Sequence, residues 1–268
     1  MTAAVLAWYR DMGVDEAMGD APTDWFAVSA RPPEPAPRRP ARPDPAPRPT
    51  RPPTPLPETR PPAATASPDE AVMDARERAR GAATLETLRE TLASFDGCPL
   101  KATAKNLCMA RGSADASIMF IGEAPGRDED LQGQPFVGRA GRLLDKMLTA
   151  IALDEATAYI TNVVYWRPPG NRTPTPQEVQ ACAPFLDRQI ELVDPEILVF
   201  LGGAAAKQML NTTEGIMRLR GKWRTLQAGT KERRAMATLH PAYLLRNPSA
   251  KRLAWRDFRA IRSALDGA

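Results

Sequence analysis

The segment Ser117–Gly122 reads SIMFIG and runs directly into Glu123–Asp130, EAPGRDED. The apolar run predicts a short buried β-strand, and the glycines and proline after it predict a tight turn. Beyond the turn, Ala140–Ile151 carries apolar residues at helical spacing. A strand, a glycine-rich turn and a helix in this order are typical of an α/β fold.

The same alternation continues on both sides of this segment. Strand-like runs follow at Tyr159–Val164, Ile197–Leu201 and Ala235–Leu239, and helical patterns cover Ser67–Phe95 (with a break near Gly81), Gln177–Leu192, Ala204–Leu210 and Ser249–Leu265. Apolar strands separated by helices predict a parallel sheet that is covered on both faces. The expected fold is α/β, with a central parallel four-stranded sheet and helices on both faces.

The N-terminal region has a different composition. Of the 28 prolines in the chain, 15 lie between Arg31 and Pro62. Proline fixes φ and lacks a backbone donor, and few apolar side chains are present there, so residues 31–63 are predicted to be a disordered linker. Residues 1–30 are predicted to be a tail with a short amphipathic helix over 2–12. That helix either docks on a protein partner or packs on its own domain, and residues 67–268 form the globular domain.

Charge is unevenly distributed along the chain. Residues 217–268 contain 13 basic and three acidic side chains, whereas residues 64–216 contain 15 basic and 21 acidic ones. The excess of positive charge near the C-terminus indicates a polyanionic partner, although a solvated basic helix is the simpler interpretation.

Targeting and redox signals are absent. No apolar stretch is long enough for a secretory signal or a membrane span, so we expect a cytoplasmic monomer that has no contact with membranes. The three cysteines, Cys98, Cys108 and Cys182, do not form a disulfide framework.

Polar residues follow the carboxyl ends of three predicted strands. Glu129, Asn162 and His240 each lie after a different strand, and ligands bind at this edge of a parallel sheet. His240 is the only histidine, and a lone histidine is ordinarily a structural group. A metal site is disfavoured because a single histidine without clustered ligands does not hold a metal ion. Neither GxxxxGK[ST] nor GxGxxG occurs, which argues against a nucleoside triphosphate site.

Three long motifs resemble a known family. GEAPGRDED with QPFVG (122–138), TNVVYWRPPGNRTP (161–174) and HPAYLLRNP (240–248) are similar to the motifs of type-4 uracil-DNA glycosylases of the uracil-glycosylase superfamily. The resemblance extends from about Phe95 to Leu265 and does not include the tail. It implies a three-layer sandwich fold, uracil-containing DNA as the partner, and hydrolysis of the N-glycosidic bond to start base excision repair.

The resemblance also implies roles for individual residues. Glu129 is expected to position or activate water, and His240 to face uracil O2. Phe136 is expected to stack on the flipped base and Asn162 to recognise its N3 and O4 edge. The backbone that holds the uracil comes from Gly122, Glu123, Ala124, Pro125 and Gly126.

Two loops are expected to contact DNA. The first is basic and irregular and contributes Arg167, Asn171 and Arg172. The second enters the helix where the base has left, and its candidate wedge residues are Tyr243, Leu244, Leu245 and Arg246.

The cysteines depart from the family pattern. Type-4 members usually hold a [4Fe–4S] cluster with four cysteines, of which Cys98 and Cys182 are present here, while Lys101 and Trp166 stand at the other two positions. Because two thiolates do not hold such a cluster, we expect no metal and no cofactor, with Cys98 and Cys182 as remnants. A 4Fe-4S cluster that also uses Cys108 is the alternative.

Other functions within and outside this family stay open. A catalytically weak or covalent uracil-DNA binding protein, or a damage sensor, would use the same fold, and a nucleosidase would act on free nucleosides. The covalent branch carries a histidine-containing insert after the second motif, whereas Asn171 and Arg172 here continue directly into Thr173. Turnover is therefore favoured.

Overall fold

The computed structural model describes residues 68–229 and 231–267. The predictions of a tail helix over 2–12 and a disordered linker over 31–63 lie outside these residues. In chain order the elements are α3 (Pro68–Gly81), α4 (Leu85–Ser94), η1 (Pro99–Ala102), β1 (Ala110–Gly112), β2 (Ile118–Gly122), α5 (Arg127–Gln132), α6 (Arg139–Thr149), β3 (Ala158–Asn162), η2 (Pro169–Asn171), α7 (Pro176–Val193), β4 (Ile197–Leu201), α8 (Gly203–Met209), α9 (Ile216–Leu219), β5 (Trp223–Ala228), β6 (Lys231–Thr238), α10 (Pro241–Arg246), η3 (Pro248–Ala250) and α11 (Lys251–Leu265).

The strands form one mixed sheet in the order β1-β3-β2-β4-β6-β5. The four central strands are parallel, as the sequence predicts, but the sheet has six strands rather than four because β1 and β5 pair antiparallel at its two edges. The edge strands were missed because β1 has only three residues and only one residue of β5 is buried. Neither has the continuous apolar run that marks a buried strand.

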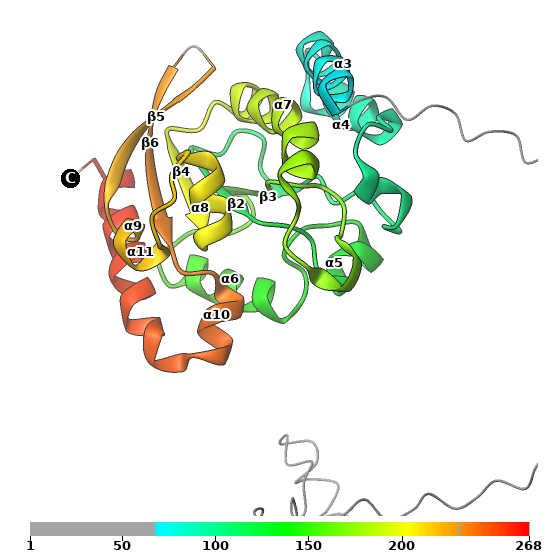
Figure 1. Ribbon diagram of the computed structural model, residues 1–268. Helices are drawn as coiled ribbons and strands as arrows, with labels where there is room; N and C mark the ends of the chain where they lie inside the picture. Colours follow the sequence, from blue (N-terminus) through cyan, green and yellow to red (C-terminus); the bar gives the residue numbers. More distant parts are fainter. Residues whose placement is uncertain (1–67, 230, 268) are drawn as a thin grey trace, which may run out of the picture. The chain divides into compact units, whose positions relative to one another are not determined.

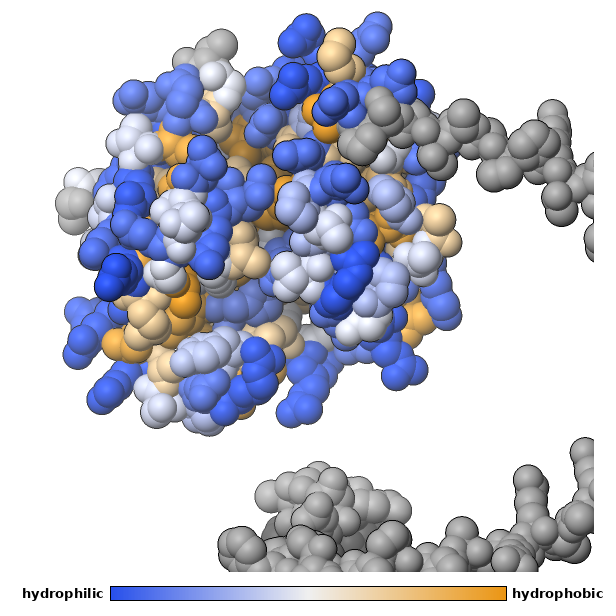
Figure 2. All heavy atoms as spheres, viewed as in Figure 1, coloured by the Kyte–Doolittle hydropathy of each residue, from blue (hydrophilic) through white to orange (hydrophobic). Residues whose placement is uncertain are grey.

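Helices cover both faces of the sheet, as Figure 1 shows. Alternate strand residues point to opposite faces, so Met119 and Ile121 join one apolar cluster with α4 and α7, and Ile118 and Phe120 join another with α6 and α11. The predicted three-layer α/β architecture is thereby confirmed. In the space-filling view of Figure 2, the visible face is mainly hydrophilic, with hydrophobic areas set between the polar residues.

The carboxyl ends of the parallel strands meet at one edge of the sheet. Gly122 at the end of β2 lies opposite Asn162 at the end of β3, and Leu201 at the end of β4 lies opposite Thr238 at the end of β6. The chain segments that follow these strands therefore converge. Among the described residues, no helix is long and apolar enough to cross a membrane.

Candidate active site

A cavity of about 450 Å³ lies beyond the carboxyl ends of the parallel strands. It brings together most of the residues predicted to form the site, although they come from separate parts of the sequence. The predicted residues that line it are Glu123, Ala124, Pro125, Gly126, Glu129, Phe136, Asn162, Asn171, Arg172, His240, Tyr243 and Arg246. Gly122, Arg167, Leu244 and Leu245 do not line it.

Asn162 presents an unpaired amide to the cavity. Its side chain is almost fully buried, and neither Nδ2 nor Oδ1 has a hydrogen-bond partner among the described residues. Buried polar atoms are nearly always paired, so this amide is an exception that a bound ligand would resolve. It offers one donor and one acceptor side by side.

Gly122 makes room for the two side chains that face the cavity. A Cβ atom at this position would lie 2.4 Å from Asn162 Oδ1 and 2.5 Å from the Phe136 ring. Any larger residue would therefore displace the amide or the ring. Gly122 therefore shapes the site from behind these two side chains.

Phe136 is held rigidly in an uncommon backbone conformation. Its φ is 56°, a left-handed value that costs a non-glycine residue on the order of 1 kcal/mol. A Cβ on Gly141 of α6 would lie 1.7 Å from the Phe136 carbonyl oxygen, so this glycine allows the helix to pack directly against the Phe136 backbone. The Phe136 ring lies 5.7 Å from the His240 ring, centroid to centroid, and both line the same cavity.

His240 is the N-cap of α10, and this position fixes its tautomer. Its Nδ1 accepts a hydrogen bond from the backbone N–H of Ala242 at 3.1 Å, so in the neutral ring the proton is on Nε2. Burial, together with a smaller effect of the positive charge of Arg246, lowers the pKa of His240 to about 4. At neutral pH the side chain is therefore an uncharged donor. Gly202, with φ 95°, allows His240 to lie close, since a Cβ there would be 2.9 Å from its Cβ.

The lowered pKa of His240 predicts a pH dependence of stability. An unfolded histidine has a pKa of about 6.5, so between pH 6.5 and about 4 the unfolded chain binds more protons than the folded one. The free energy of unfolding therefore has its full value, as far as His240 is concerned, above pH 6.5. It decreases as the pH falls toward 4, by up to about 3 kcal/mol. Chemical denaturation at pH 7 and pH 5 measures it. His240→Asn, which keeps a capping side chain but does not titrate, should show a smaller decrease than the parent protein; equal decreases would contradict the assignment.

Glu129 joins the two halves of the first motif, GEAPGRDED and QPFVG. Its Oε2 accepts from the backbone N–H of Gly126 at 3.1 Å, and its Oε1 accepts from that of Gly138 at 2.8 Å. Sequence reasoning assigned Glu129 to water, and the structure adds this second function of holding the turn after β2 against the start of α6. Gly138 was missed as a site residue because its contribution is a backbone N–H.

The loop that contains the candidate wedge residues forms α10. Tyr243 is 38% exposed and Leu245 is 37% exposed, and Arg246 is also exposed, so all three are accessible to DNA. Leu244 is only 1% exposed and packs in a small apolar cluster with Leu239 and Ala254. Helical periodicity thus turns Leu244 inward, so the candidate wedge residues that are accessible on α10 are Tyr243, Leu245 and Arg246, and the contact of Leu244 with DNA stays a prediction.

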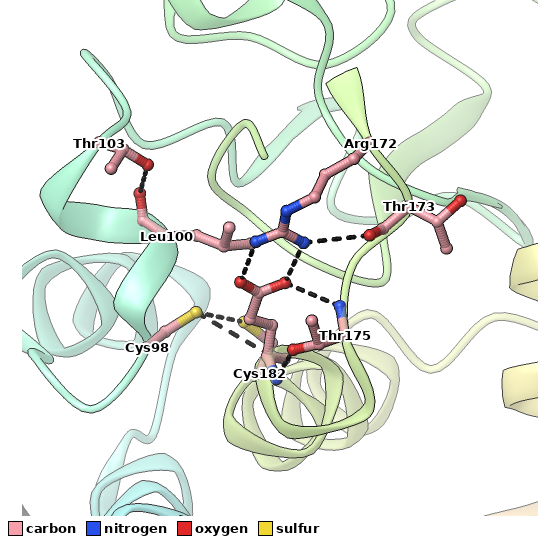
Figure 3. Close-up of polar contacts among 8 residues, drawn as sticks. Cys98, Leu100, Thr103, Arg172, Thr173, Thr175 and Cys182 are labelled. Atoms are coloured by element: carbon pink, nitrogen blue, oxygen red, sulfur yellow. Dashed lines mark hydrogen bonds and ion pairs between the residues drawn. The ribbon is translucent and has the colours of Figure 1, made fainter. Parts of the chain in front are cut away.

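The basic loop is internally bonded. Arg167 Nε donates to Asn171 Oδ1 at 2.7 Å, and the Arg172 guanidinium donates to both carboxylate oxygens of Glu178, at 2.8 and 2.6 Å (Figure 3). This pairing lowers the pKa of Glu178, which also accepts from the backbone N–H of Thr175 at the start of α7. Arg172 is thus partly neutralised and holds the loop in place.

Cys98 and Cys182 lie side by side next to this ion pair (Figure 3). Their Sγ atoms are 3.8 Å apart, and both side chains are buried. Cys108 lies elsewhere, with its Sγ donating to the Glu129 carbonyl at 3.1 Å, and burial raises its pKa to about 12. Lys101 Nζ is bonded to Asp96 and to the Ala93 carbonyl.

Curated relatives of the chain are type-4 uracil-DNA glycosylases. The protein of this name from Archaeoglobus fulgidus is 41% identical over 182 residues, which is 66% of this chain and 92% of the relative. Those from Sulfurisphaera tokodaii and Thermotoga maritima are 41% and 39% identical, over 84% and 93% of their own lengths.

The relatives correct the prediction of a cofactor-free domain. Type-4 enzymes are iron–sulfur proteins, and at this level of identity the expectation of no cofactor is wrong. Cys98 and Cys182 are the residues placed to contribute to such a cluster. Within residues 68–229 and 231–267, these two thiols do not complete a four-thiolate set, and no group of three or more cysteine, histidine or acidic side chains is close enough to hold a metal. The fit to the cluster is therefore incomplete.

The profile of one protein family matches the chain over residues 109–259, and its description is "Uracil DNA glycosylase superfamily". This range contains every residue that lines the cavity. It also contains the four parallel strands that position those residues. The chain therefore belongs to the uracil DNA glycosylase superfamily.

Proposed function

We propose that the protein is a uracil-DNA glycosylase, which removes uracil from DNA by hydrolysing its N-glycosidic bond and so starts base excision repair. The observation that carries this proposal is the buried, unpaired amide of Asn162 in a cavity that also holds an aromatic ring and a neutral histidine donor. The names of the relatives support the same substrate.

The Asn162 amide has the right pair of groups for uracil. Its Nδ2 would donate to uracil O4 while its Oδ1 accepts from N3–H. Cytosine has an acceptor at N3 and a donor at C4, so both contacts would be reversed. Because each of these polar atoms is already desolvated, a mismatched base would leave them unpaired, which is the stronger form of discrimination.

Phe136 would supply the stacking surface for the extruded base. A base inside a duplex cannot reach the cavity, so the nucleotide must rotate out at a cost of a few kcal/mol. Tyr243, Leu245 and Arg246 of α10 are exposed beside the cavity and would fill the space that the base leaves. The strained but packed Phe136 backbone keeps its ring in place before the base arrives.

His240 would stabilise the leaving group. Cleavage of the C1′–N1 bond leaves negative charge on the uracil, shared by O2 and O4, and positive charge on the sugar. The Nε2–H of a neutral His240 would donate to O2, and the backbone N–H groups of the turn after β2 would add further donors. Burial keeps this histidine neutral, so the donor is available without a change of protonation.

Glu129 would act on the water that attacks the sugar. Its two oxygens are bonded to Gly126 and Gly138, yet each carboxylate oxygen can accept more than one hydrogen bond. A water held by the remaining acceptor positions would be directed at C1′, and the carboxylate would offset positive charge on the sugar. The backbone bonds fix the carboxylate in place.

A uracil-DNA binding protein without turnover is the second candidate, since the same pocket would recognise uracil. A panel of substrates separates the two: single-stranded and duplex DNA with one deoxyuridine, matched thymidine and deoxycytidine strands, and free deoxyuridine. We expect free uracil and alkali-labile abasic sites from both deoxyuridine DNAs, and none from the other substrates. A stable protein–DNA adduct without free uracil would identify the binding protein instead, and cleavage of free deoxyuridine at an equal rate would identify a nucleosidase.

A further inference from the structure

A second, smaller cavity lies between α6, α10 and α11, outside the proposed active site. Its volume is about 190 Å³, and apolar side chains make up almost all of its wall. Leu244 and Phe258, both buried, form part of the wall, and the indole of Trp255 is 45% exposed beside them. A single exposed aromatic residue is common on a protein surface, but Trp255 is continuous with an apolar-walled cavity, and an apolar surface of this kind can receive the ring of a ligand.

The surroundings of this cavity are basic. Lys146 of α6 and Lys251 of α11 line its opening. Arg139, Arg142 and Lys146 are exposed and spaced i, i+3, i+7, so they share one face of α6. Within the described part of the chain none of these cations, nor Lys251, takes part in an ion pair. The acid of α6, Asp145, pairs with Arg111. Asp257 of α11 pairs with Arg220, and Asp266, the C-cap of α11, pairs with Arg262.

The basic face of α6 connects the two cavities. The helix begins at Arg139, three residues after Phe136 of the active site, and Lys146 lies seven residues further on. Seven helical residues rise about 10 Å, which is about three steps of a stacked DNA strand at 3.4 Å per step and fewer steps of an extended one. A strand that leaves the active site along α6 would thus bring a nearby nucleotide to Trp255.

We propose that this cavity is a subsite for a nucleobase that flanks the uracil in single-stranded DNA. The base stacks on Trp255, and the phosphates beside it lie against Lys146 and Lys251. Stacking on an exposed aromatic side chain and charge contacts to the backbone are the two interactions by which proteins hold single strands without reading their sequence. The subsite rests on the proposed function and extends it, because it gives the enzyme a preference for strands of a certain minimum length.

The test compares substrates that reach Trp255 with substrates that do not. Single-stranded oligonucleotides carry one deoxyuridine and between one and about six nucleotides on its 5′ or 3′ side. For Trp255→Ala we expect KM to rise about 10-fold on the long substrates of one polarity, with kcat unchanged, and no change on the shortest substrates. Trp255→Phe should restore most of the loss. Met73→Ala, which removes another exposed apolar side chain, on α3, is the matched control.

Removing a base from the substrate completes a double-mutant cycle with Trp255→Ala. An abasic nucleotide at the position that reaches Trp255 should raise KM for the parent protein and leave Trp255→Ala unaffected. Lys146→Ala should weaken binding of the long strands and reduce the slope of log Kd against log salt by about 1, whereas Arg80→Ala on α3 should not.

Three outcomes would overturn the subsite. The first is an equal KM for Trp255→Ala and the parent protein on every substrate, and the second is a KM increase of the same size on short and long substrates. The third is a changed sedimentation coefficient of Trp255→Ala, which would make the cavity an interface between copies. If the parent protein releases uracil from none of these substrates, the proposed function itself has failed, so the two failures are distinguishable.

Discussion

Replacing Asn162 by alanine should reduce single-turnover uracil release by about 1,000-fold or more without destabilising the protein. The loss follows because the amide supplies both contacts that distinguish uracil, and a site built on hydrogen bonds loses most when they are removed. The unchanged stability of Asn162→Ala is expected because the amide that it removes is buried without hydrogen-bond partners. The free protein holds Nδ2 and Oδ1 without partners, and each such atom costs about 1–3 kcal/mol. Removing them offsets the loss of packing.

Gln189→Ala is the matched control for this variant. Gln189 is also a buried amide, but its Nε2 donates to the Tyr159 hydroxyl at 2.7 Å and its Oε1 accepts from Tyr165 at 2.8 Å. Its removal leaves two buried tyrosine hydroxyls without this hydrogen-bond partner and should lower the free energy of unfolding by several kcal/mol. Rapid-quench assays should therefore show the slower uracil release for Asn162→Ala. Denaturant titration should show the lower stability for Gln189→Ala. If Asn162→Ala unfolds as easily as Gln189→Ala, the amide is structural and the proposed role is wrong.

Replacing His240 should also have a large effect, and two variants separate its two functions. His240→Asn keeps a side chain that caps α10 but lacks a donor in the position of Nε2. We expect about 100- to 1,000-fold slower uracil release, the usual result of removing one donor to a developing anion. His240→Ala should be equally slow and also less stable by about 1 kcal/mol, because the N-cap is lost as well.

DNA affinity distinguishes a chemical role of His240 from a structural one. Both variants should bind uracil-containing DNA with a Kd close to that of the parent protein, since the donor acts mainly on charge that develops during cleavage. Fluorescence anisotropy with labelled oligonucleotides measures this. A variant that loses binding and cleavage in equal proportion would show that His240 holds the substrate instead of the leaving group.

Much of the fold could be predicted because its signals are local. Ile197–Leu201 is a continuous apolar run and is β4 without a residue of error. The edge strands could not be recognised in this way, since β5 has only one buried residue and is specified by pairing with β6. Leu244 was assigned to the DNA surface from its motif, while the turn of α10 that buries it depends on packing against distant residues.

The site shows the same division between local and distant information. The positions of Asn162 at the end of one strand and His240 beyond the end of another predicted that both would line one cavity, because parallel strands end at a common edge. The contributions of Gly202 and Gly141 could not be predicted, since each depends on how closely another segment approaches. The cofactor expectation failed for another reason: it gave the two replaced cysteine positions more weight than the overall similarity to type-4 enzymes.

The two backbone bonds of Glu129 also bear on how the cavity opens. A carboxylate that bridges Gly126 and Gly138 couples the turn after β2 to the segment that carries Phe136. Neither wall can open by local fluctuation without releasing the same side chain, so the two form one cooperative unit with a shared opening free energy. Under the proposed function, the base would then enter from the α10 side, and the half of the pocket proposed to recognise uracil would stay preorganised before the base arrives.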